Sequence, residues 1–190
     1  EKRGISKVVP LWNPDGCIQC NRCSFVCPHG VIRPVAMTEK QKKEAPSDMK
    51  TAIMAGEKEK YFAIIISTDD CTGCTLCSDI CPGNIKNNVL KMSENDRAGY
   101  QKKCYEYGIK NNDNKHVRDH FERGTVKGSQ FFSPLLEFSG ACAGCGETAY
   151  AKLATQLFGE RMIIANATGC SSIWAASMPS VAYTTNSDNK

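Results

Sequence analysis

The chain has 190 residues, and its 24 Lys and Arg against 20 Asp and Glu leave a formal net charge of only +4. This weak, interleaved charge gives no reason to expect nucleic acid as a partner. A hydrophobic share of 41% excludes wholesale disorder, and no apolar run approaches the ~18 residues of a membrane-spanning helix. Cysteine is the unusual residue: its 12 copies are about 6% of the chain, below the ~8–10% of small disulfide-rich domains.

The first eight cysteines form two copies of one pattern, C-x2-C-x2-C-x3-C followed by proline. The copies are Cys17, Cys20, Cys23 and Cys27 before Pro28, and Cys71, Cys74, Cys77 and Cys81 before Pro82. Every cysteine of the second copy lies 54 residues after its counterpart. Because apolar residues flank both copies at matching positions, the pattern predicts an internal duplication of strand, cysteine loop, short helix and strand.

This spacing favours two [4Fe-4S] clusters. Three cysteines two residues apart on a tight loop direct three thiolates toward one compact inorganic core, and in the bacterial run of this spacing the fourth cysteine ligates the other cluster. The predicted ligands are therefore crossed, with Cys17, Cys20, Cys23 and Cys81 at one cluster and Cys71, Cys74, Cys77 and Cys27 at the other. Since crossed ligation joins the two repeats, metal binding should be part of folding.

Three other interpretations of the eight cysteines fit the pattern less well. Disulfides need an oxidising compartment, and no signal segment is visible. Structural zinc uses pairs of cysteines with longer spacers, and a chance match does not explain two copies in register. Apolar residues near the loops are predicted to keep water off the clusters: Ile18, Val26, Val31, Ile80 and Ile85. We expect Cys104 to be a free structural thiol, and His29, His116 and His120 to lie at the surface.

The segment between the repeats is longer than two clusters need. Residues 39–60 are polar, which predicts an exposed insertion with some helix around Met49 to Ala55. It is either a docking surface for a partner or a solvated loop.

The character of the sequence changes after Gln130. Apolar residues from Ala149 to Phe158 follow a helical stripe that Gly159 ends. A strand-like run, Arg161 to Ala165, leads into a loop of small residues, and a helix is expected from Ile173. This α/β order, with a loop between strand and helix, suits a phosphate or diphosphate.

A third cysteine group accompanies this part of the chain. It consists of Cys142, Cys145 and Cys170. One C-x2-C pair with a distant cysteine is compatible with zinc, a redox pair or a cluster, and it lacks a fourth ligand here.

The two cysteine motifs resemble the bacterial two-cluster ferredoxins, which transfer single electrons. Over nearly the whole chain, the motifs are similar to those of the pyruvate:ferredoxin (flavodoxin) oxidoreductases, also called pyruvate synthases. The matching segments are Gly16–Asn21, Phe25–His29, Lys127–Phe131, Ser139–Glu147, Gln156–Trp174 and Tyr183–Asn186. We therefore expect an α+β fold: a ferredoxin-like domain with an insertion at 1–136, then an incomplete α/β segment of a thiamine diphosphate domain at 137–190.

The resemblance implies oxidative decarboxylation of pyruvate to acetyl-CoA with thiamine diphosphate and Mg²⁺. It also implies three [4Fe-4S] clusters that pass electrons singly to ferredoxin or flavodoxin. Cys142, Cys145 and Cys170 match ligands of the third cluster, and Glu147, Thr168, Gly169 and Cys170 match positions at thiamine diphosphate. The chain begins with Glu and ends on a motif that looks unfinished, so we expect it to be part of a longer protein.

The resemblance also sets limits. The family's fourth ligand of the third cluster and its Gly-Asp-Gly segment are absent, so we expect no pyruvate turnover by this chain alone and assign it no catalytic residue. The resemblance implies that the remaining domains of the parent enzyme supply these parts, and that the parent enzyme is a homodimer. It also implies a location in the cytoplasm or in an organelle of an anaerobic eukaryote. The alternatives are a stand-alone two-cluster electron carrier and a zinc-binding interaction module.

Overall fold

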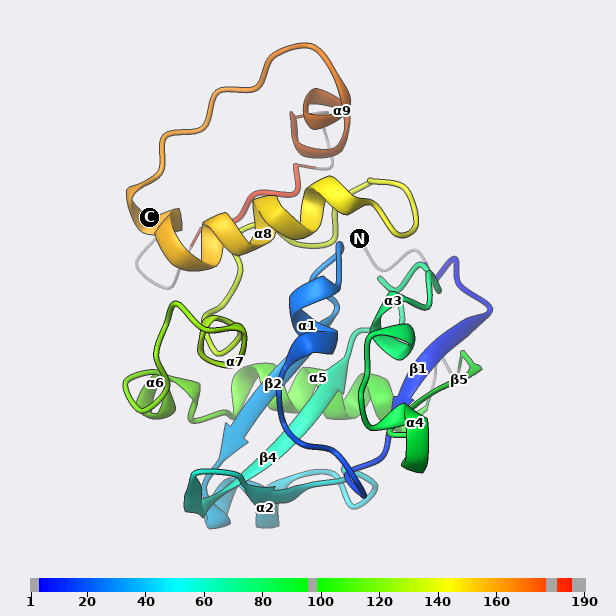
Figure 1. The fold of residues 1–190 in the computed structure, drawn as a ribbon, viewed down its shortest axis with the longest axis vertical. Coiled ribbons are helices and arrows are strands. Elements are labelled where there is room, and N and C mark those ends of the chain that lie inside the picture. Colours follow the sequence, from blue (N-terminus) through cyan, green and yellow to red (C-terminus); the bar gives the residue numbers. More distant parts are fainter. Residues whose placement is uncertain (1–3, 96–98, 177–180, 186–190) are drawn as a thin grey trace.

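A computed structural model describes residues 4–95, 99–176 and 181–185, which form a mixed α/β fold with two small antiparallel sheets (Figure 1). The first sheet pairs β1 (Val8–Trp12) with β5 (Leu90–Glu94). The second has the strand order β2 (Ile32–Met37), β4 (Glu57–Ile66), β3 (Ala52–Met54).

The predicted duplication is visible in the order of the elements. The first repeat runs β1, cysteine loop, α1 (Arg22–Val26), β2, and the second runs β4, cysteine loop, α3 (Leu76–Asp79), α4 (Asn84–Asn87), β5. Strand β1 pairs with β5 and β2 pairs with β4. Each sheet therefore joins a strand of one repeat to a strand of the other, so the two repeats share one core.

The core lies between these sheets and the helices that cover them. All six residues of β2 are buried, and Trp12 packs edge-on against Phe62 with ring centroids 6.0 Å apart. Helix α5 (Tyr100–Lys110) packs on β4 through Gly108. A Cβ at Gly108 would lie 2.8 Å from the Ile65 side chain, so the missing side chain lets the helix approach the sheet closely.

The insertion between the repeats is structured differently from the prediction. Its helix is α2 (Glu39–Glu44), which Thr38 and Gln41 begin with a capping box. The helix predicted around Met49 to Ala55 is wrong, because this segment forms β3. The chain turns back at Gly56, whose φ is +92°, so that Ala52 and Ile53 pair with the free edge of β4. Pairing with this open sheet edge outweighs the local preference for helix.

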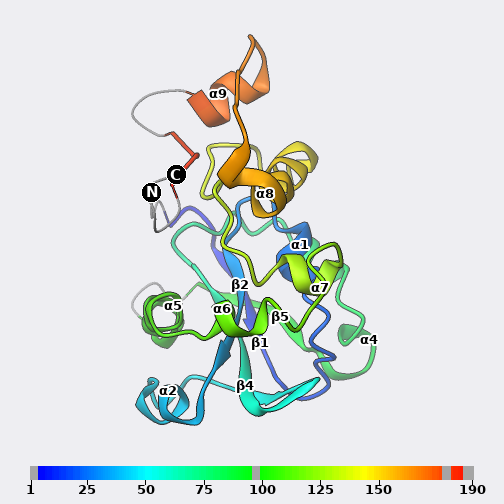
Figure 2. The same ribbon diagram turned by 90° about the vertical axis from the view of Figure 1, so that its left-hand side faces the viewer.

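The remaining helices follow the second repeat in the chain. They are α6 (Asn114–Val117), α7 (Val126–Ser129), α8 (Gly146–Phe158), the 3-10 turn η1 (Gly159–Arg161) and α9 (Cys170–Ala176). The segment that carries α6 and α7 contacts the insertion through His120 and Lys127. Helix α8 crosses above α1 and packs on α1 and α7, while α9 lies beyond α8 (Figures 1 and 2). The segment after residue 136 is therefore seated on the first cysteine helix.

Two predictions for this segment need correction. Helix α8 ends where expected, before Gly159, but the strand predicted at Arg161 to Ala165 is absent: Ile163 is 99% exposed. The predicted apolar stripe does not form the buried face either. The fully buried residues of α8 are polar, namely Thr148, Lys152, Thr155 and Gln156, because this face meets the carbonyl groups and polar side chains of α1, α7 and the following loop.

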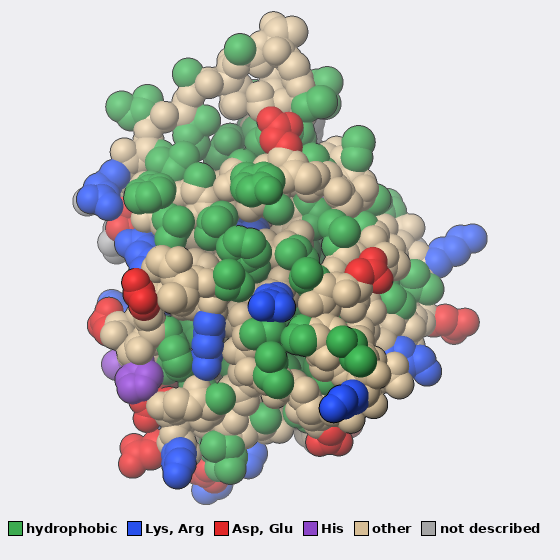
Figure 3. Space-filling model, in the orientation of Figure 1, with side chains coloured by type: hydrophobic (Ala, Val, Ile, Leu, Met, Phe, Trp, Pro, Cys, Tyr) green, Lys and Arg blue, Asp and Glu red, His purple; other side chains and the backbone are tan. Residues whose placement is uncertain are grey.

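The expected helix after the small-residue loop is present, although it begins at Cys170 and not at Ile173. Hydrophobic side chains are spread over the face that carries α8, whereas most charged side chains lie toward its edges and lower end (Figure 3). Within the described ranges, no helix combines the length and the apolar character that crossing a membrane requires.

Candidate metal centres

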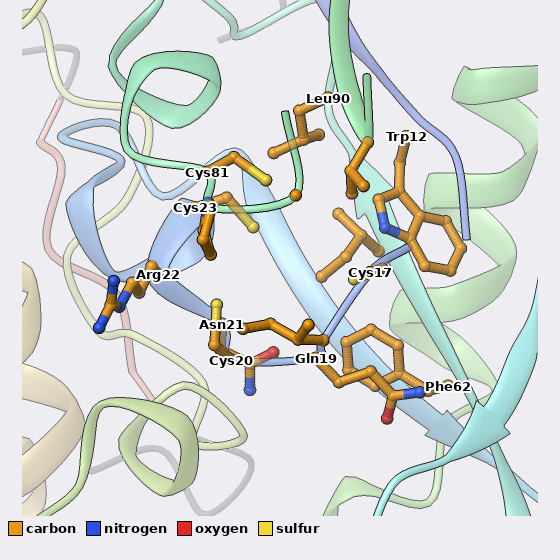
Figure 4. Close-up of a pocket in the computed structure, with 15 residues that line it drawn as sticks. Trp12, Cys17, Gln19, Cys20, Asn21, Arg22, Cys23, Phe62, Cys81 and Leu90 are labelled. Atoms are coloured by element: carbon orange, nitrogen blue, oxygen red, sulfur yellow. The ribbon is translucent and has the colours of Figure 1, made fainter. Parts of the chain in front are cut away.

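The first cavity is lined by four of the eight repeat cysteines, Cys17, Cys20, Cys23 and Cys81. Three come from the first repeat, and Cys81 comes from the end of α3 in the second. Figure 4 shows the sulfur atoms of Cys20, Cys23 and Cys81 directed toward the space that Cys17 also borders. The rest of the wall is apolar and includes Trp12, Phe62, Ile64, Val89 and Leu90.

The second cavity has the complementary composition. It is lined by Cys71, Cys74 and Cys77 of the second repeat and by Cys27, which ends α1 of the first. Two cavities, each lined by three cysteines of one repeat and one of the other, are what a duplicated site for one kind of group requires.

The short helices explain why the sets are crossed. Helices α1 and α3 pack against each other. Each carries its third cysteine, Cys23 or Cys77, toward the cavity of its own loop, and the chain then turns so that the fourth, Cys27 or Cys81, reaches the other cavity. The structure thus brings the eight cysteines together in the two predicted sets, while their binding of iron stays a prediction.

The cysteine loops have matching backbone conformations. Gln19 and Asn21 in the first loop have φ values of 53° and 59°, and their counterparts Gly73 and Thr75 have 70° and 66°. Left-handed backbone is costly for residues other than glycine, so the loop at Gln19 needs contacts that hold it.

Two side chains of the first loop supply these contacts. The Gln19 amide donates to the Ile53 carbonyl and accepts from the Ala55 amide, both at 2.7 Å. The Asn21 amide donates to the Lys127 carbonyl at 2.9 Å. Sequence reasoning gave neither residue a role, although both stand between cysteines in a segment that it singled out.

Burial is the main cause of the raised pKa values of the thiols of Cys23 and Cys71. It raises the pKa of Cys23 well above its usual value, and the nearby Cys77 and Cys17 raise it further. Burial likewise raises the pKa of Cys71 to about 12, although the Gly73 amide, which donates to its sulfur at 3.4 Å, acts in the opposite direction. Thiolates crowded into such cavities need positive charge to compensate them, which metal ions provide.

The donor set also bears on the kind of group that fits. Among the residues that the structure describes, no three Cys, His, Asp or Glu side chains are placed to hold a single metal ion. The eight repeat cysteines surround two cavities instead. Four thiolates around an apolar cavity suit an iron–sulfur core that consists of several atoms.

The apolar shell differs from the expectation. Val31 is buried, but Ile18 is 64% exposed and Ile85 is 85% exposed, and Ile80 also faces solvent. Ile18 nevertheless lines the first cavity and Val31 lines the second, as predicted. The prediction is wrong for Ile80 and Ile85, which line neither cavity, because the strands and Trp12 supply most of the apolar shell.

The predicted surface position of His29 is wrong as well. The ring is buried, its Nδ1 lies 3.2 Å from the Ser139 carbonyl oxygen, and its own carbonyl accepts from the Phe138 amide. His116 and His120 are exposed as predicted. Cys104 is a buried free thiol, also as predicted.

The third cysteine group is more open. Cys142 and Cys170 are exposed and Cys145 is half-buried. The loop between Cys142 and Cys145 lies beside the second cavity, because a Cβ on Gly144 would be 3.6 Å from the Cys74 Cβ.

The residues predicted to lie at thiamine diphosphate are in the same region. Glu147 accepts a hydrogen bond at 3.3 Å from the indole of Trp174 in α9. Thr168 and Gly169 are exposed in the loop before Cys170. Their roles, and the division of the chain at residue 136, stay predictions.

A family model described as "4Fe-4S double cluster binding domain" matches residues 16–84. Among curated proteins, the chain is 49% identical over 186 residues to a pyruvate-flavodoxin oxidoreductase of Enterobacter agglomerans and 50% identical over 188 residues to a pyruvate:ferredoxin oxidoreductase of Moorella thermoacetica. It is 50% identical over 191 residues to a pyruvate dehydrogenase (NADP+) of Cryptosporidium parvum.

These alignments cover 98% of this chain but only 15%, 16% and 10% of the respective relatives. The chain therefore spans a small part of the length of the proteins that it matches. The resemblance drawn from its motifs is confirmed: the chain is homologous to one segment of pyruvate:ferredoxin and pyruvate-flavodoxin oxidoreductases.

Proposed function

We propose that each four-cysteine cavity holds one [4Fe-4S] cluster and that the chain conducts electrons inside an enzyme that oxidises pyruvate to acetyl-CoA. The observation that carries this proposal is the pair of similar cavities, each lined by three cysteines of one repeat and one of the other. The matched family model supports the type of cluster. When bound, such clusters accept and release one electron at a time.

The proposed ligands are those that line the cavities. Cys17, Cys20, Cys23 and Cys81 hold the first cluster, and Cys71, Cys74, Cys77 and Cys27 hold the second. The apolar walls keep water away from both positions. Because α1 and α3 carry ligands of both clusters, the distance between the clusters is set by the backbone and not by flexible side chains.

The position of the loop between Cys142 and Cys145 supports an order of transfer. A Cβ on Gly144 would lie 3.6 Å from the Cβ of Cys74, so this loop is beside the second cavity. Cys142, Cys145 and Cys170 then hold a third [4Fe-4S] cluster once a fourth ligand is supplied by the rest of the parent enzyme. Electrons enter at this end and leave through the first cavity.

The segment from residue 137 is proposed as the beginning of the thiamine diphosphate domain. Glu147, Thr168, Gly169 and Cys170 would contribute to the pocket for thiamine diphosphate and Mg²⁺. Large apolar side chains here face solvent, among them Tyr150, Phe158, Ile163 and Ile173. Exposed apolar surface of this extent is typical of an interface, so it supports burial against further domains of a parent enzyme, which we expect to be homodimeric.

The final acceptor is a ferredoxin or a flavodoxin in this proposal. The names of the relatives from Moorella thermoacetica and Enterobacter agglomerans support both. The relative from Cryptosporidium parvum is named for NADP+, so the acceptor varies among relatives of this segment.

The proposal is tested by anaerobic purification followed by iron and sulfide analysis and by EPR after reduction. We expect about eight iron and eight sulfide per chain, and the same content in a Cys104→Ser variant, because Cys104 lies outside both cavities. A colourless protein with one zinc for each four cysteines would refute the proposal.

A further inference from the structure

Lys152 is a buried cation that the proposed electron path does not use. It is 1% exposed and lies on the face of α8 that packs against α1. Its Nζ donates to the carbonyl oxygens of Ser24 and Phe25, the latter at 3.2 Å. These carbonyls belong to the last turn of α1, at the negative end of the helix dipole, where a cation is favourable. The Ser24 carbonyl also accepts from the Cys27 amide at 3.3 Å.

The position of this ammonium relates it to both cavities. Ser24 and Phe25 lie between Cys23, which lines the first cavity, and Cys27, which lines the second. Burial lowers the pKa of Lys152 to about 8, and Cys27 and Cys23 oppose this effect. Two carbonyl acceptors at the end of a helix favour the ammonium form of this side chain, which lies at the point where α1 passes from one cavity to the other.

The other charges nearby balance each other. Arg33 forms an ion pair with Glu137 and also donates from Nε to the Gly30 carbonyl at 2.5 Å. A Cβ on Gly30 would lie 3.5 Å from the Lys152 side chain, 3.5 Å from that of Arg33 and 3.6 Å from that of Glu137. Since Glu137 is paired with Arg33, Lys152 has no carboxylate of its own among the described residues, and a buried ammonium without a counter-charge is strongly unfavourable.

We propose that the negative charge of the two clusters is the counter-charge of Lys152, and that Lys152 raises the reduction potential of both. This inference rests on the proposed function, because it requires clusters in the cavities. Reduction of a cluster takes one electron from a low-potential donor and adds one negative charge. A fixed cation in a water-poor setting stabilises that added charge, so the reduced form gains more from Lys152 than the oxidised form does.

Lys152 thus influences the potentials of both clusters through its charge, and it does so across the domain boundary predicted at residue 136. The ferredoxin-like part carries the cysteines, while the cation comes from the segment that follows. The potentials of the two clusters then depend on how α8 is seated on α1.

The test is an anaerobic redox titration of the full chain with dithionite, followed by EPR, in which iron and sulfide are also measured. Lys152→Gln keeps a hydrogen-bond donor and removes the charge. We expect a full iron content and a shift of both midpoints to more negative values, with at least a tenfold change in the reduction equilibrium, about 59 mV for one electron. Lys152→Arg keeps the charge and should restore the potentials.

Lys43→Gln is the matched control, because Lys43 is an exposed lysine of α2; its midpoints should equal those of the original chain. A Lys152→Gln protein with full iron and unchanged midpoints overturns the inference but leaves the proposed function intact. If that variant assembles no clusters, Glu137→Gln decides, because it leaves Arg33 unbalanced in the same place. Its midpoints must shift to more positive values, and unchanged midpoints overturn the inference. Absence of iron from the original chain refutes the proposed function itself.

Discussion

Replacement of Gln19 tests whether the first cysteine loop is held by the insertion. Gln19→Ala removes two hydrogen bonds, one to Ile53 and one from Ala55, both 2.7 Å long. A hydrogen bond of this kind contributes about 0.5–1.5 kcal/mol net, so the pair contributes ~1–3 kcal/mol. Because Ile53 is largely exposed, water replaces part of the loss, and we expect about 1.5 kcal/mol.

Gln19→Gly is the informative companion variant. It loses the same hydrogen bonds, but glycine adopts the left-handed backbone of position 19 without strain, which for other residues costs ~1–2 kcal/mol. Part of this gain is offset by the greater freedom of glycine in the unfolded chain. We therefore expect Gln19→Gly to be less destabilised than Gln19→Ala.

Hydrogen exchange of the cluster-loaded protein measures the effect directly, because the Ala55 amide is itself the donor to Gln19. A loss of about 1.4 kcal/mol corresponds to a tenfold faster exchange of that amide. The guanidinium concentration at which visible absorbance is lost gives the second measure. Unchanged exchange at Ala55 in Gln19→Ala, or a Gln19→Gly protein that is the less stable of the two, would refute this account of the loop.

Two further predictions concern the crossing and the connection to α7. Cys27→Ala should convert the second cluster to a three-iron form or remove it, and it should leave the first cluster intact, although Cys27 belongs to the first motif. EPR and iron analysis distinguish the two clusters. Damage confined to the first cluster would contradict the crossed ligation. Gly128→Ala should destabilise the fold by ~1–3 kcal/mol, because a Cβ there would overlap the Glu122 carbonyl. A Cβ at Gly124 has room, so the stability of Gly124→Ala should differ from that of the original chain by no more than about 0.5 kcal/mol. Denaturation monitored by loss of absorbance compares them, and equal stabilities would argue against a tight contact.

The cysteine sets could be predicted because three members of each set are close in sequence. Spacings of two residues within one loop bring those three thiols together, and the repeated register predicts the duplication. The fourth thiol comes from the other repeat, and its place was expected from the crossed ligation known for this cysteine run. The insertion could not be predicted in this way. Its residues 52–54 become a strand only because the edge of β4 is available beside them, and that edge is formed by residues that the local sequence does not specify.

The errors around α8 have the same origin. An apolar stripe predicts a buried face when a helix rests on an apolar surface. Helix α8 rests instead on carbonyls and amides, so Lys152, Thr155 and Gln156 are buried and Phe158 is exposed. His29 is buried for a related reason, because the chain at Phe138 and Ser139 passes over it. Such long-range contacts leave no periodic trace in the sequence.

The duplication also explains how two similar loops come to have different surroundings. Gln19 and Gly73 are equivalent positions with the same left-handed backbone, yet Gln19 uses its side chain to bind the insertion, whereas any side chain at position 73 would collide with Ser6. The neighbouring Cys74 is instead covered by the loop that carries Gly144. One loop thus faces a segment inserted between the repeats and the other faces the third cysteine group. A symmetric pair of clusters has no preferred direction for electrons, so it is this difference between positions 19 and 73, and not the cysteine pattern, that gives the proposed path its two distinct ends.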